Sequence, residues 1–126
     1  MRKVFSLVVI LIFICGIFVF EAKALTEDEK IDYLISCASQ LEGKFIRNGK
    51  EHTPAEGVTH IQRKRKYFFR FRKPDVKIFI EKVAFGSWKT KMPYIWRDTN
   101  GREHLLQDVL AEKLKELENN GERLKI

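Results

Sequence analysis

The pentapeptide Asn-Gly-Lys/Arg-Glu-His occurs twice in this chain, at residues 48–52 and again at 100–104. Asn-Gly tolerates the positive φ angles of a type I′ turn, so residues 45–47 and 50–52 around Asn48-Gly49 are predicted to form a tight β-hairpin. In the second copy, residues 93–97 are predicted to form a strand that turns at residues 98–101 into residues 102–104. The chain must therefore fit two hairpins between its helical segments.

Two helices are predicted on either side of the first hairpin. Thr26 and Glu29 have the spacing of a capping box, which predicts a helix from Thr26 to near Gly43. Thr53-Pro54-Ala55-Glu56 is a second start signal, with Thr as N-cap and Pro at the first helical position. That helix is predicted to run into the basic residues near Lys66.

Two more helical patterns surround the second hairpin. After Pro74, apolar residues recur at helical spacing until Gly86, at Val76, Phe79, Ile80, Val83 and Ala84. The last helix carries an apolar face and is predicted to end at residues 119–121, the face being Leu106, Val109, Leu110, Leu114 and Leu117. The predicted fold is a small α+β domain of order α-ββ-α-α-ββ-α, with two short hairpins packed on helices.

The repeated pentapeptide has two interpretations that the sequence leaves open. Each copy has a helix before it and a helix after it, as an internal duplication of two similar halves around one core would produce. Alternatively, turn chemistry favours Asn-Gly independently at both sites, and the remaining matches are coincidence.

The N-terminus has the pattern of an export signal. Arg2 and Lys3 precede an apolar run over residues 4–20, and Ala22 and Ala24 then form the A-x-A pattern that signal peptidase accepts. We therefore expect residues 1–24 to be a signal peptide cleaved after Ala24, and residues 25–126 to be one mature domain starting at Leu25 in the periplasm. The alternative is an uncleaved membrane anchor formed by residues 4–20, because this run is nearly long enough to span a bilayer.

Three stretches of the mature segment carry motifs of one known family. The first is residues 45–49 with His52-Thr53, and the second is Ala55-Glu56 followed by His60 and Lys64. The third is residues 79–84, which lead through a polar loop to Pro93-Tyr94. Together these stretches resemble the YfeK-like family, small exported bacterial proteins with a domain of unknown function. This resemblance implies no activity, because the family has none assigned.

The motifs of this resemblance supply the candidate binding residues: Arg47, Asn48, His52, His60, Lys64, Ser87, Thr90 and Tyr94. The polar loop departs from the family pattern S-S-x-S-G-x-P-Y. Trp88 and Lys91 stand where the family has a small Ser and a Gly. Because glycine allows close approach to the backbone, Lys91 argues against a ligand held by the backbone of this loop.

The candidates offer little for catalysis. His60 and Lys64 are four residues apart and share a helix face, so a small hydrolase-like enzyme using His60 with Ser87 or Thr90 is the alternative function. No motif supplies a group to orient His60 or an oxyanion hole. His52, His60 and His104 lack metal-ligand spacing, so we expect neither a metal site nor a cofactor, and no catalytic residue is assigned.

A basic stretch interleaved with aromatic residues is the strongest physical signal. Its cations are Arg63, Lys64, Arg65, Lys66, Arg70, Arg72 and Lys73, among Tyr67, Phe68, Phe69 and Phe71. Export argues against nucleic acid, so the expected partner is an anionic lipid surface, an acidic envelope polymer or an envelope protein. The alternative is a solvated helix end whose aromatic side chains turn into the core. We therefore expect a non-enzymatic binding or interaction module.

Overall fold

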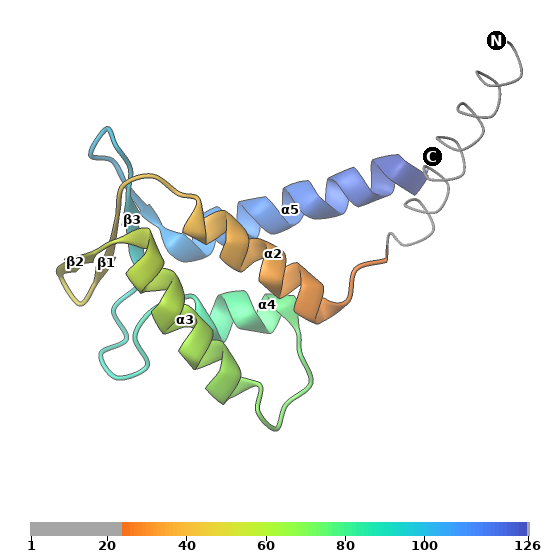
Figure 1. Cartoon of the computed structure of the whole chain (residues 1–126), viewed down its shortest axis with the longest axis horizontal. Coiled ribbons are helices and arrows are strands. Elements are labelled where there is room, and N and C mark those ends of the chain that lie inside the picture. The colour runs from red at the N-terminus through yellow and green to blue at the C-terminus, as the bar shows by residue number, and fades with distance from the viewer. Residues whose placement is uncertain (1–23, 126) are drawn as a thin grey trace, which may run out of the picture.

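The two predicted hairpins lie side by side in one antiparallel sheet with helices packed on it (Figure 1). The computed structural model describes residues 24–125. The sheet order is β2-β1-β3-β4, with β1 and β3 antiparallel at the centre. The elements follow in the chain as α2 (Glu27–Ser39), β1 (Lys44–Arg47), β2 (Lys50–His52), α3 (Pro54–Phe68), α4 (Val76–Ile78), η1 (Phe79–Val83), β3 (Ile95–Arg97), β4 (Glu103–Leu105) and α5 (Leu106–Lys125). The predicted α+β class and element order are confirmed.

Both predicted capping boxes are present. The Thr26 hydroxyl accepts from the backbone N–H of Glu29, whose carboxylate accepts from the Thr26 N–H, at 3.1 and 3.0 Å. Thr53 and Glu56 make the same pair at 3.2 and 3.1 Å, with Pro54 at the start of α3. These local contacts satisfy backbone donors that a helix start leaves without partners, so both helices begin where the sequence predicts.

The first hairpin turn also matches its prediction. Asn48 and Gly49 have φ angles of 52° and 76°, both positive as a type I′ turn requires. The second copy of the motif adopts a wider turn, in which Asp98 Oδ1 accepts from the N–H groups of Asn100 and Arg102 at 2.9 Å each. The turns of the two copies of the motif therefore differ in geometry.

Strand register places one row of side chains on the same face of the sheet. From β2 to β4 this row is His52, Phe45, Trp96 and His104. Phe45 is 4% exposed and belongs to the core. The core joins this face to α2, η1 and α5, and its fully buried members include Ile31, Leu34, Phe79, Val83, Leu106 and Leu110.

Three helix details differ from the sequence predictions. Helix α2 ends at Ser39, before Gly43, and the helix after Pro74 changes into a π-helical turn at η1. The predicted end of the last helix at residues 119–121 is wrong, because α5 continues to Lys125. Gly121 is not among the glycines with positive φ, so the backbone does not form the left-handed turn that would end the helix.

The predicted signal peptide, and the alternative anchor at residues 4–20, lie outside the described residues apart from Ala24. Within residues 24–125, no helix is both long enough and apolar enough to cross a membrane.

Candidate functional site

A pocket of about 410 Å³ opens between the first hairpin and α3. Its apolar wall includes Phe45, Ile46 and Ile61. Its polar lining residues are Arg47, His52, Glu56, Thr59, His60, Arg63 and Tyr94. The structure therefore brings four of the predicted binding residues to one cavity: Arg47, His52, His60 and Tyr94.

A hydrogen-bonded chain of three side chains lies beside this pocket. The Tyr94 hydroxyl is 2.9 Å from Lys64 Nζ and 3.0 Å from His60 Nε2. A lysine ammonium can only donate, so the Tyr94 oxygen accepts from Lys64. The direction of the His60–Tyr94 bond follows the tautomer of His60: Nε2 accepts the Tyr94 proton when Nδ1 carries the ring proton, and otherwise donates to the Tyr94 oxygen.

Lys64 holds α3 against the end of η1. Its side chain is 6% exposed, and Nζ donates to the carbonyls of Val83 and Gly86 at 2.8 and 2.6 Å. The same Nζ lies 4.5 Å from the ring centroid of Trp88. A cation at a helix C-terminus satisfies carbonyls that the helix leaves unpaired. Burial lowers the pKa of Lys64 to about 8, so it remains mostly protonated at pH 7.

The pocket has a positive electrostatic environment. The pKa of His60 falls to about 4, mainly because burial disfavours the charged ring. The next largest cause is the positive charge of Arg47, followed by those of Lys64 and Arg63. Burial also raises the pKa of Tyr94 to about 12. At neutral pH His60 and Tyr94 are thus uncharged, and the charge beside the pocket comes from the cations and from Glu56.

His52 forms part of the same pocket but makes weaker contacts. Its Nδ1 is 3.8 Å from the Glu56 carboxylate, and its Nε2 is buried without a hydrogen-bond partner among residues 24–125. Glu56 itself accepts from the backbone N–H of Thr53. This capping bond and the nearby His52 lower the pKa of Glu56, so it is an anion fixed to the start of α3.

The predicted residues of the polar loop have different contacts. Ser87 Oγ accepts from the Thr90 N–H at 3.2 Å, and Thr90 Oγ1 donates to Asn48 Oδ1 at 2.6 Å. These bonds attach the loop to the first hairpin turn. In the described part of the chain, no hydrogen bond joins His60 to Ser87 or Thr90. Lys91 has a φ of 65°, a left-handed conformation that favours the glycine of the family pattern.

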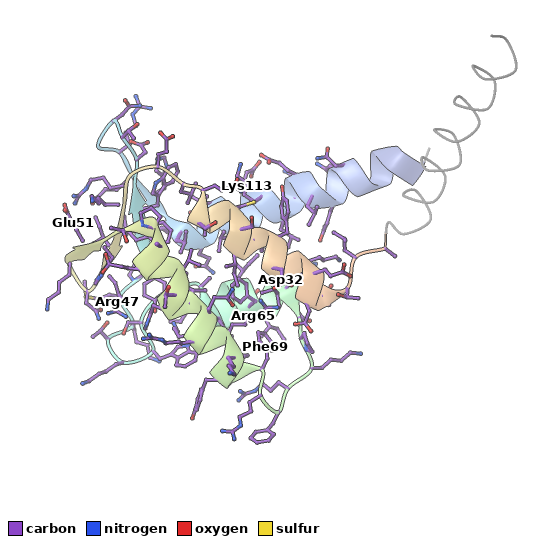
Figure 2. All side chains as sticks on the ribbon, viewed as in Figure 1. Asp32, Arg47, Glu51, Arg65, Phe69 and Lys113 are labelled. Carbon is purple, nitrogen blue, oxygen red and sulfur yellow. The ribbon has the colours of Figure 1, made fainter. Side chains whose placement is uncertain are left out.

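The cations of the basic stretch separate into three groups. Lys64 is buried, and Arg63 lines the pocket. Arg65 binds the carboxylates of Asp28 and Asp32, which ties the end of α3 to α2 (Figure 2). These three residues therefore do not belong to one cationic surface.

The other four cations surround two exposed aromatic side chains. Phe71 is 89% exposed and Tyr67 is 71% exposed, whereas Phe68 and Phe69 pack against the core. We call this region the α3–α4 tip, defined by Lys66, Tyr67, Arg70, Phe71, Arg72 and Lys73. Within it, the guanidinium groups of Arg70 and Arg72 lie 5.3 and 4.3 Å from the ring centroids of Phe71 and Phe68.

A family model describes most of this chain. The family of unknown function DUF5329 matches residues 25–118. The chain belongs to this family. No curated protein and no solved structure matches it. Membership in DUF5329 assigns no activity to the chain.

Sequence reasoning missed most residues of this pocket, including Gly57 and Arg63. Gly57 lies in α3 where a Cβ would overlap the ring of Phe45, so this glycine lets the hairpin approach the helix. Arg63 was assigned to the basic surface but lines the pocket. A glycine inside a helix is the one signal that could have been noticed, because it is unfavourable there without a packing reason.

Proposed function

We propose that this chain is an exported, non-enzymatic binding module that associates reversibly with anionic lipid surfaces through its α3–α4 tip. The observation that carries this proposal is the exposure of Phe71, at 89%, between cationic neighbours. An apolar ring enters the interface of a bilayer while the surrounding cations remain among the anionic headgroups.

The charges of the α3–α4 tip determine the expected affinity for an anionic bilayer. Each Lys or Arg near an anionic bilayer contributes about 1 kcal/mol. Lys66, Arg70, Arg72 and Lys73 together give about 4 kcal/mol, which corresponds to a dissociation constant of about 1 mM. Insertion of Phe71 into the bilayer interface makes the binding free energy more favourable still. The expected association is weak and reversible, and it becomes weaker at high salt because salt screens the exposed charges.

The N-terminal end of the described domain, at the start of α2, lies on the same side as the α3–α4 tip (Figure 1). Arg65, near the end of α3, binds Asp28 at the start of α2. The backbone N–H of Val76, which follows the tip, donates to Glu27 at 3.1 Å. Figure 1 shows the start of α2 and the α3–α4 connection on the same side of the molecule. If residues 4–20 remain as an anchor, the tip is therefore held near the membrane.

Export rests on the sequence pattern of residues 1–24 and on the resemblance to the YfeK-like family. The expected outcome is a mature protein that begins at Leu25. N-terminal sequencing of the exported protein checks this, and a bulky replacement of Ala24 should accumulate the precursor. A membrane-bound species that retains Met1 would instead establish the anchor.

Liposome co-sedimentation tests the tip. The mature domain should bind vesicles rich in phosphatidylglycerol at low salt and dissociate at high salt. A variant with Arg70, Arg72 and Lys73 changed to Gln should lose most binding, and Phe71→Ser should weaken it at constant charge. The matched control changes Lys44, Lys50 and Arg102, three exposed cations on the hairpins, to Gln. Equal binding by the tip variant and this control would reject the proposal.

A further inference from the structure

Two guanidinium groups line the pocket without a carboxylate partner. Arg65 and Arg97 each bind two carboxylates, whereas Arg47 and Arg63 form no ion pair within 4.0 Å among residues 24–125. Arg47 is the last residue of β1 in the first hairpin (Figure 2), whereas Arg63 belongs to α3. Two cations from different elements thus converge on one cavity.

The other residues that line the pocket indicate which kind of anion it binds. Phe45, Ile46 and Ile61 give the cavity an apolar side, while Tyr94 and His60 contribute neutral polar groups. A volume of about 410 Å³ is within the usual range for small-molecule sites. A bare inorganic anion would leave the apolar wall without a contact. An organic acid with an apolar body uses both parts of the lining.

Glu56 limits the charge of the ligand. Its carboxylate lines the same pocket and is fixed by the Thr53 N–H and by proximity to His52. This negative charge offsets one of the two guanidinium charges. The net field therefore suits a single negative charge better than a dianion.

From this lining we propose that the pocket between the first hairpin and α3 binds a small monocarboxylate with an aromatic or cyclic apolar body. Arg47 and Arg63 hold the carboxylate, since arginine donates two parallel hydrogen bonds to such a group. The apolar body packs on Phe45, Ile46 and Ile61. This site is separate from the α3–α4 tip and does not depend on membrane association.

Calorimetric titration of the mature domain with benzoate and cyclohexanecarboxylate tests the site. At least one acid should show saturable binding, and its neutral alcohol, benzyl alcohol or cyclohexanemethanol, should bind at least about tenfold more weakly. Arg47→Gln and Arg63→Gln should each reduce affinity about tenfold. Lys50→Gln is the matched control, because Lys50 lies opposite Arg47 in the hairpin but outside the pocket lining.

The pKa of His60, followed by NMR, gives a second readout. A bound carboxylate next to the ring should raise this pKa above about 4. The neutral alcohols should leave it unchanged. Absence of saturable binding by both acids, equal binding of acid and alcohol, or the same loss in Lys50→Gln as in the arginine variants would each overturn the proposal. Thermal melts of every variant establish that it is folded.

Discussion

Replacement of Lys64 by methionine should lower the free energy of unfolding by about 3 kcal/mol, because buried hydrogen-bond acceptors would be left without their donor. Methionine preserves the apolar stem but cannot donate. The carbonyls of Val83 and Gly86 would then be buried without their Lys64 donor, and Tyr94 would lose the same donor. In a domain of about 100 residues this loss should reduce the midpoint of thermal unfolding by 10 °C or more.

Lys66→Met is the control for this measurement, because Lys66 is an exposed lysine two positions away in the same helix. Its midpoint should change by only a few degrees. Tyr94→Phe should fall between the two variants, since it removes a single hydroxyl from the chain that links Lys64 to His60. Equal midpoints for the Lys64 and Lys66 variants would show that the buried ammonium does not stabilise the fold.

Gly57→Ala should destabilise the domain by about 1–3 kcal/mol, although alanine is the better helix former. A Cβ at Gly57 would overlap Cδ2 of Phe45, and Phe45 is only 4% exposed, so its ring cannot move away without disturbing the core. The same substitution at Gly121 meets no atom within 4 Å in helix α5. Gly121→Ala should therefore stabilise the domain by about 0.5–1 kcal/mol.

Thermal or urea unfolding of both glycine variants checks the opposite signs. The double variant Gly57→Ala with Phe45→Leu should lose less stability than the sum of its single variants, because a smaller side chain relieves the overlap. Additive losses, or a stabilising effect of Gly57→Ala alone, would contradict the close packing of α3 on the hairpin.

The features predicted correctly from the sequence are those made by neighbouring residues. The capping boxes at Thr26 and Thr53 and the turn at Asn48-Gly49 each involve contacts within four positions. Their geometry follows from local backbone chemistry, so no distant part of the chain is needed to specify them. The predicted end of the last helix failed for a related reason. Gly121 permits a left-handed turn but does not require one, and the helix continues through it.

The basic stretch shows where local reasoning stops. In the sequence, Arg63, Lys64 and Arg65 are three adjacent cations, and nothing local distinguishes which of them lies on the basic surface. Successive residues on a helix point about 100° apart, so each side chain meets a different part of the fold. One lines the pocket, one is buried against η1, and one binds two aspartates of α2. Only the cations after Arg65 remain for the α3–α4 tip.

The sequence by itself thus determined the α+β class, the order of the elements, both helix starts and the first turn. The tertiary structure alone decided that Tyr94 joins Lys64 to His60, across 30 and 34 positions of the chain. It also decided that Arg47 and Arg63 meet in one pocket and that Phe71 stays exposed. The physical reason is that burial and long-range hydrogen bonds depend on how α3 packs against the hairpin and η1, and no local pattern records that packing.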